Sequence, residues 1–130
     1  MSTQSNTLSK VISKVLIFLG VVLVGTYVVY LPMPSLFQAD AFANLSIVLY
    51  GLASAGSAFV AWGMIMGSMN GDSVTRAQVL TASAAGFALL AFMRLVTAVF
   101  PPEVFQAMIF LPAGEFVAFS VIAMILLKSR

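Results

Sequence analysis

Long runs of residues without a charged side chain constrain the fold of this chain more than any other feature. The uncharged runs are Val15 to Ala39, Ala41 to Gly71, Ala77 to Met93 and Phe116 to Leu127. A helix needs about 20 apolar residues to cross the hydrocarbon core of a bilayer. The first three runs are roughly of this size, and the fourth reaches it if its helix begins before Phe116. The pattern therefore predicts four transmembrane helices.

The composition favours an all-α integral membrane protein. Of the 130 residues, 62% are hydrophobic and only 8% are charged, which leaves too little polar surface for a soluble domain of this size. Transmembrane strands would appear as short segments of alternating polarity, and the sequence contains none. We predict a single four-helix bundle domain over residues 1–130.

Turn signals place the ends of the predicted spans. Prolines at Pro32 and Pro34 end the first span, Asn70-Gly71-Asp72 ends the second, and Pro101-Pro102 ends the third, because proline cannot continue a hydrogen-bonded helix. The polar residues before Val15 are expected to form a short cytoplasmic tail, with an interfacial helix near its end as an alternative. The resulting spans are about 15–31, 44–69, 77–100 and 109–127.

Pro112 leaves the start of the fourth span open. Proline is favoured in the first turn of a helix, so the span can begin close to this residue. Alternatively, the span begins earlier and kinks at Pro112, or residues 103–111 form a separate interfacial helix that covers the end of the bundle.

The lysines and arginines outside the spans fall on one side of this topology, whereas the opposite loops contain only Asp40 and Glu103. Cytoplasmic loops carry an excess of Lys and Arg. We therefore predict a multi-pass protein of a cell membrane, typical of a bacterial inner membrane, with both termini in the cytoplasm. The residues that give this prediction are Lys10, Lys14, Arg76, Lys128 and Arg130.

Several classes of function are disfavoured by residues that the sequence lacks. Cysteine and histidine are both absent, which excludes disulfides, thiol chemistry, histidine-ligated haem and the usual zinc sites. No nucleotide-binding loop or catalytic triad is present, and a net charge of +2 gives no reason to expect nucleic acid. We expect no metal and no cofactor, and a non-enzymatic role is favoured.

Arg94 and Glu115 are ionisable residues inside predicted spans. Such a group costs at least about 2.5 kcal/mol at the bilayer centre and needs a partner. At a rise of about 1.5 Å per residue, Arg94 lies about 27 Å from Arg76, and Glu115 lies about 20 Å from Lys128. The third and fourth spans should be antiparallel neighbours. We therefore expect Arg94 and Glu115 to pair in the outer half of the membrane.

Two kinds of role are open for these residues. In the structural role, the pair only joins the third and fourth helices. Alternatively, the Arg94 side chain extends to the outer headgroups and leaves Glu115 unpaired near the start of the fourth helix. In the functional role, the pair belongs to a polar pocket open to the outer leaflet. Tyr50, Ser54 and Thr97 lie at a similar depth and are candidates to complete this pocket.

Small residues spaced four apart are the second pattern in the spans. Such spacing allows helix backbones to approach closely in lipid. It predicts either helix contacts within one bundle or a face for a homo-oligomer or a larger membrane complex. The residues predicted for helix packing are Gly51, Ala55, Gly63, Gly67 and Gly86.

Short motifs in the last three spans carry a resemblance to a known group of proteins. They are Tyr50-Gly51, Arg94-Leu95 with Thr97, the proline turn Pro101-Pro102, and Glu115. On these motifs the chain resembles an uncharacterised four-helix membrane family, a domain of unknown function that is DoxX-like in plan. Related sequences often place a glycine before the proline turn, where this chain has Phe100. The resemblance implies mainly the fold, and it suggests a link to quinone-coupled enzymes or to the chaperoning of membrane proteins.

Two functional hypotheses follow. The first is an accessory subunit, or a module that binds a small ligand such as a lipid or quinone at the Arg94–Glu115 cluster. Its partners are the bilayer and either a membrane protein or a second copy of the chain. The alternative is a dimeric proton-coupled transporter of small molecules that uses Glu115, although a neighbouring guanidinium would hold this carboxylate in its charged form.

Overall fold

The computed structural model describes residues 3–37, 45–69 and 73–130, with side chains from Thr7 onward. All regular structure in this part of the chain is helical except a single bridge residue at Ser73. Four helices are long and apolar enough to cross a membrane. The helices are α1 (Thr3–Tyr30), η1 (Pro34–Phe37, a 3-10 turn), α2 (Leu45–Ser68), α3 (Arg76–Val99), α4 (Glu103–Gln106) and α5 (Phe110–Ser129).

The first helix differs from its predicted range. α2 and α3 begin and end within one residue of the second and third predicted spans, but α1 begins at Thr3 rather than near Val15. The polar segment that was expected to be a tail continues the helix, because no proline or glycine interrupts it before Gly20. Ser13, which lies in this segment, is buried and donates a hydrogen bond to the Gly63 carbonyl of α2.

Pro112 lies in the first turn of α5, which begins at Phe110. The proline is buried, and its missing N–H costs nothing there because the first turn has no carbonyl partner to bond. The segment before it forms the separate short helix α4 rather than an extension of α5. The structure therefore answers the question that the sequence left open, in favour of a start close to Pro112.

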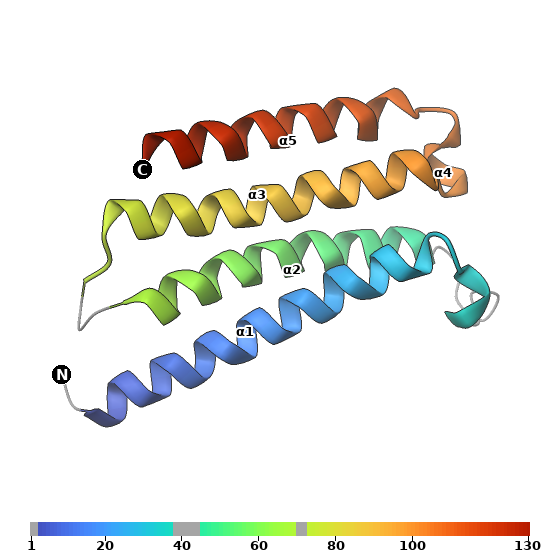
Figure 1. The fold of residues 1–130 in the computed structure, drawn as a ribbon. Coiled ribbons are helices and arrows are strands. Elements are labelled where there is room, and N and C mark those ends of the chain that lie inside the picture. The colour runs from blue at the N-terminus through green and yellow to red at the C-terminus, as the bar shows by residue number, and fades with distance from the viewer. Residues whose placement is uncertain (1–2, 38–44, 70–72) are drawn as a thin grey trace.

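The four long helices run alternately in opposite directions, so α1 begins and α5 ends at the same end of the bundle (Figure 1). The most extensive contacts join α1 to α2 and α3 to α5, and a smaller interface between α2 and α3 connects these two helix pairs. α5 lies at the edge of the bundle against α3. The bundle is therefore built from two antiparallel helix pairs.

Glycines bring α1 and α2 into backbone contact. A Cβ atom on Gly56 of α2 would lie 2.8 Å from the carbonyl oxygen of Gly20 in α1 and 2.9 Å from Leu23 Cβ. A Cβ atom on Gly63 would lie 2.8 Å from the carbonyl oxygen of Ser13. In a bilayer, van der Waals contact replaces the hydrophobic effect between helices, and this close approach increases such contact in the first pair.

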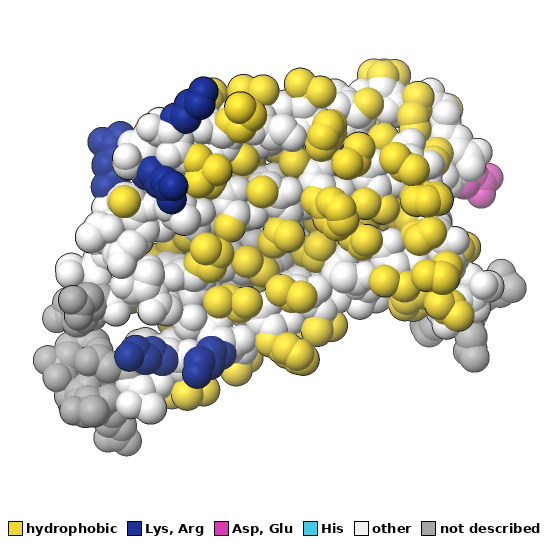
Figure 2. Space-filling view, in the orientation of Figure 1, with side chains coloured by type: hydrophobic (Ala, Val, Ile, Leu, Met, Phe, Trp, Pro, Cys, Tyr) yellow, Lys and Arg dark blue, Asp and Glu magenta, His cyan; other side chains and the backbone are white. Residues whose placement is uncertain are grey.

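Apolar and charged side chains are separated along the bundle. Large hydrophobic residues on all four long helices are exposed, including Phe18, Trp62, Val99 and Phe110, and yellow side chains cover much of the visible surface (Figure 2). Lysines and arginines gather at the end where α1 begins and α5 ends, which we call the basic end. We call the other end of the bundle the opposite end. The acidic side chains that are visible in this view lie there. Lipid is the solvent that suits such a surface.

Candidate functional site

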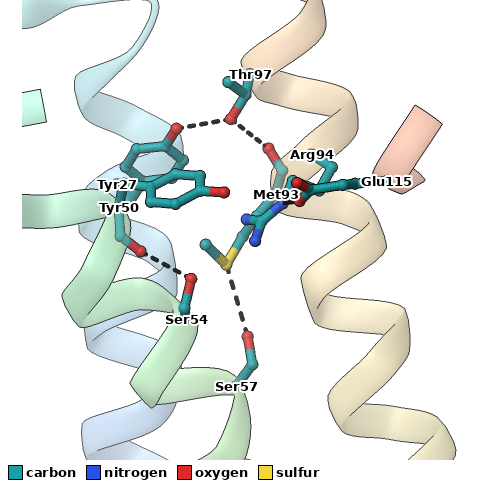
Figure 3. A network of polar contacts seen from close by, with 8 residues as sticks. All are labelled: Tyr27, Tyr50, Ser54, Ser57, Met93, Arg94, Thr97 and Glu115. Atoms are coloured by element: carbon teal, nitrogen blue, oxygen red, sulfur yellow. Dashed lines mark hydrogen bonds and ion pairs between the residues drawn. The ribbon is translucent and has the colours of Figure 1, made fainter. Parts of the chain in front are cut away.

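The candidate site lies towards the end of α3, on the side that faces α2 and α5. The Arg94 side chain is only 8% exposed, and its Nε donates to Glu115 Oε2 on α5 in an ion pair. The Glu115 side chain is 31% exposed. Figure 3 shows both side chains beside Tyr50, with Thr97 one turn further along α3. The structure therefore brings together the two charged residues that helical counting placed at similar depths.

Aromatic rings from two helices surround the guanidinium. Its Cζ atom lies 4.4 Å from the centre of the Tyr50 ring on α2 and 5.5 Å from the centre of the Phe119 ring on α5. Both distances are within the range of cation–π attraction, which is strongest where water is excluded. Phe105 of α4 packs on Tyr50, with its ring centre 5.3 Å from that of Tyr50.

One atom of this cluster lacks a partner. Arg94 Nη1 is buried and makes no hydrogen bond within the described part of the chain. No other buried side-chain nitrogen or oxygen of the described residues lacks a hydrogen-bond partner. Leaving a buried donor unpaired costs about 1–3 kcal/mol, and more when the group is charged. An acceptor supplied from outside the chain would recover this energy.

Tyr27 and Thr97 form a second polar contact next to the ion pair. The Thr97 hydroxyl donates to the Met93 carbonyl over 2.7 Å, so the Tyr27 hydroxyl is the donor in the 2.6 Å bond to Thr97 Oγ1. Both side chains are fully buried. Thr97 was expected in the pocket with Arg94, but its hydrogen bonds go to Tyr27 and to its own helix. Tyr27 was not among the predicted site residues.

Ser54 uses its hydroxyl within α2, where it donates to the Tyr50 carbonyl over 2.9 Å. One helical turn further along, Ser57 is buried and donates to the Ala53 carbonyl. Its hydroxyl also approaches Met93 Sδ of α3 at 3.6 Å. Figure 3 shows these contacts as a line of polar groups between α2 and α3. Ser54 therefore lies near the cluster without a hydrogen bond to either charged side chain.

The predicted small residues divide between two faces of the bundle. Gly63 and Gly67 face Ser13 of α1, and Gly86 of α3 faces Ala61 of α2. Gly51 and Ala55 are exposed, and a Cβ atom on Gly51 would meet no atom within 4 Å. Of the two predicted alternatives, packing within the bundle does not apply to these two residues, and a face for a second copy or a larger complex stays a prediction. The buried face of α2 carries other residues. These are Ala53, Gly56, Ser57, Val60 and Gly63.

A cavity of about 1010 Å³ opens at the opposite end of the bundle, which we call the end cavity. It is lined by residues one helical turn beyond the polar cluster, with Tyr30 following Tyr27 on α1 and Ile47 preceding Tyr50 on α2. Val104 and Gln106 of α4 also line it. Phe105, which packs on Tyr50, lies between these two residues. The end cavity and the Arg94 cluster are therefore neighbouring layers of the bundle. The residues that line the end cavity are Tyr30, Leu31, Pro34, Leu45, Ser46, Ile47, Val99, Phe100, Pro101, Pro102, Glu103, Val104 and Gln106.

No protein-family model, curated protein or solved structure matches the chain. The resemblance to DoxX-like proteins therefore stays a prediction from the motifs around Tyr50, Arg94 and Glu115. Within residues 3–37, 45–69 and 73–130, there is no group of three or more acidic residues that could hold a metal ion. Any function assigned to the site must come from its own geometry.

Proposed function

We propose that this chain is a multi-pass membrane protein that binds the polar head of a lipid or quinone at Arg94. The observation that carries this proposal is the buried Nη1 atom without a hydrogen-bond partner. A guanidinium has five N–H groups and no acceptor, and the ion pair described above uses the one on Nε. A ligand oxygen on Nη1 would remove the cost of burying this donor unpaired.

The charge balance favours a neutral acceptor. Glu115 already compensates the positive charge of Arg94, so a ligand anion would bring one negative charge too many into a region of low dielectric. A carbonyl oxygen accepts a hydrogen bond and adds no charge. Quinones and the ester groups of lipids both present such an oxygen on a molecule that dissolves in the bilayer.

The aromatic surroundings support a flat or elongated apolar ligand. Tyr50 and Phe119 flank the guanidinium at 4.4 and 5.5 Å from their ring centres, and rings of this kind pack well on another flat group. Binding sites for small molecules are typically apolar with a few polar groups that fix orientation. The cluster fits this description and differs from a site built for a soluble anion.

The placement of the protein in a cell membrane, with both termini in the cytoplasm, belongs to the same proposal. It is supported by four helices of sufficient length and by the five lysines and arginines of the basic end, because cytoplasmic loops are enriched in these residues. The Arg94 cluster would then lie in the outer half of the membrane. An accessory subunit that holds a lipid or quinone for a partner enzyme is compatible with this placement.

The experiment that tests the proposal measures ligands that co-purify with the protein. Wild type, Arg94→Lys and Arg76→Lys would be purified from membranes in mild detergent, and bound small molecules would be extracted and quantified by mass spectrometry. Arg94→Lys keeps the positive charge near Glu115 but removes the Nη1 donor. Arg76→Lys makes the same change on the same helix at the exposed basic end.

We expect a lipid or quinone at close to one per chain in wild type and in Arg76→Lys, and at least a fivefold reduction in Arg94→Lys. Equal amounts in all three proteins would contradict the proposal.

The transporter hypothesis has weaker support, because Glu115 is held by an ion pair to a buried guanidinium. It would gain support if Glu115→Gln abolished a proton flux that wild type carries in liposomes.

A further inference from the structure

A second cluster of polar groups lies at the basic end, far from Arg94 along α3. α3 begins and α5 ends there, and the two helices are packed against each other. Three exposed cations belong to these two helices at the basic end: Arg76, Lys128 and Arg130. Lys10 and Lys14 lie in the first half of α1, which begins at the same end.

A cavity of about 460 Å³ accompanies these cations, and we call it the basic cavity. It is lined by Ser68 of α2, by Ala77, Gln78 and Thr81 of α3, and by Arg130. Arg130 reaches from α5 to α3, where its Nη1 donates to Thr81 Oγ1 over 3.4 Å. The basic cavity therefore lies where the ends of three helices meet, and a guanidinium and a hydroxyl face into it.

The helix ends around the basic cavity are held by their own hydrogen bonds. The Gln78 amide nitrogen donates to the Ser68 carbonyl over 3.0 Å, and this bond ties the end of α2 to the start of α3. Thr75 and Gln78 form a capping box at the first turn of α3. These contacts fix the walls of the cavity, whereas Arg130 makes one long and exposed bond and is free to bind a stronger acceptor.

We propose that the basic cavity binds the phosphate of an anionic phospholipid. Basic pockets between helix ends at a membrane surface are suited to such headgroups, and a guanidinium binds phosphate oxygens through two donors at once. The last turns of α5 also expose apolar side chains, among them Met124 and Ile125, which are 56% and 57% exposed. The acyl chains would lie on this surface while the phosphate binds Arg130.

Electrostatics favour an anionic over a zwitterionic lipid at this end. The acidic residues that the structure describes are Glu103 and Glu115, and neither lies at the basic end. Asp72 lies between α2 and α3 in the sequence, outside the described residues, and carries one negative charge against five positive charges. Each Lys or Arg near the surface raises the affinity for an anionic membrane about fivefold at low salt.

The test compares two variants that remove the same charge from the same end. Lys128→Gln/Arg130→Gln removes the cation that lines the basic cavity together with its neighbour in the sequence, and Lys10→Gln/Lys14→Gln removes two cations from α1. Binding of phosphatidylglycerol and phosphatidylcholine to the detergent-solubilised protein would be measured by native mass spectrometry. Circular dichroism would verify that both variants keep the helix content of wild type.

We expect wild type to prefer phosphatidylglycerol by at least tenfold, Lys128→Gln/Arg130→Gln to lose most of this preference, and Lys10→Gln/Lys14→Gln to change it less than threefold. An equal loss in both variants would mean that diffuse charge attracts the lipid, and it would overturn the proposal. Displacement of the lipid by millimolar inorganic phosphate would also overturn it, because the site would then take a free anion. The inference rests on the proposed membrane placement but not on the Arg94 site, whose test uses different variants.

Discussion

Tyr27 on α1 and Thr97 on α3 are joined by a 2.6 Å hydrogen bond between two fully buried hydroxyl groups. α1 makes few other contacts with α3, so this bond is a specific link between the two helix pairs. It lies beside the Arg94 cluster, with the Tyr27 ring edge-on to the Tyr50 ring at a centre distance of 5.8 Å. The position of the candidate site thus depends on the same contacts that hold the two pairs together.

The first prediction concerns the direction of this hydrogen bond. Thr97→Val leaves the Tyr27 O–H buried with no acceptor, and we expect it to lower the free energy of unfolding by about 1–3 kcal/mol. Tyr27→Phe removes only the donor and leaves Thr97 bonded to the Met93 carbonyl, so its cost should be smaller, about 0.5–1.5 kcal/mol. Unfolding by denaturing detergent in mixed micelles measures both.

The double variant Tyr27→Phe/Thr97→Val is the control for this prediction. It removes both hydroxyl groups and leaves no unpaired donor, so its loss should be smaller than the sum of the two single losses. Additive losses would show that the two side chains stabilise the bundle independently and that the bond itself contributes little.

The second prediction tests the ion pair as a structural link. Arg94→Ala and Glu115→Ala should each lower the free energy of unfolding by about 3 kcal/mol, because each leaves a charge between the helices without its partner. The double variant should recover much of this loss. If all three variants unfold like wild type, the pair does not hold α3 to α5, and only the binding role of Arg94 would remain.

The third prediction concerns the glycines of α2. Gly56→Ala would place a Cβ 2.8 Å from the Gly20 carbonyl oxygen, and we expect a loss of about 1–3 kcal/mol from the forced separation of α1 and α2. Gly51→Ala is the matched control on the same helix, since its Cβ meets no atom within 4 Å. Its stability should be unchanged or raised by up to about 1 kcal/mol.

A different result at Gly51 would be informative. If Gly51→Ala is destabilising, or if Gly51→Leu changes the oligomeric state in detergent, the exposed face with Gly51 and Ala55 contacts a second copy or another protein. The original prediction of a helix-packing role would then apply to an interface between chains instead of a contact within one chain.

The fourth prediction tests the orientation in the membrane. The chain contains no cysteine, so a single introduced cysteine is a specific reporter. Gln106→Cys at the opposite end should react with a membrane-impermeant maleimide in intact cells, and Ser129→Cys at the basic end should react only after lysis. The reverse pattern would place the termini outside and would contradict the charge rule for this protein.

Much of the fold followed from local features of the sequence. Uncharged runs of spanning length predicted the long helices, and Asn70-Gly71-Asp72 and Pro101-Pro102 placed the ends of α2 and α3 within one residue. The start of α1 was missed, because polar residues such as Ser13 continue a helix as easily as they end one. For Pro112 the sequence permitted several starts of α5, and only the backbone geometry distinguished them.

The candidate site was less predictable than the fold. Depth along a helix can be counted from the sequence, and this count placed Arg94 and Glu115 at levels that a long side chain can join. The direction in which a side chain points around its helix is set by contacts with neighbouring helices. Tyr27 illustrates the difference, since no sequence pattern singled it out as a site residue, whereas it is fully buried against Thr97.

The sequence by itself determined that this chain forms long apolar helices, roughly where they begin and end, and which end of the bundle is basic, because these properties depend on composition and on one-dimensional spacing. The tertiary structure decided which faces of the helices meet. It paired Arg94 with Glu115, turned Gly51 outward and Gly56 inward, and left Arg94 Nη1 without a partner. The physical reason is that van der Waals and hydrogen-bond contacts between helices select one rotation of each helix, and hydrophobicity does not distinguish these rotations in lipid.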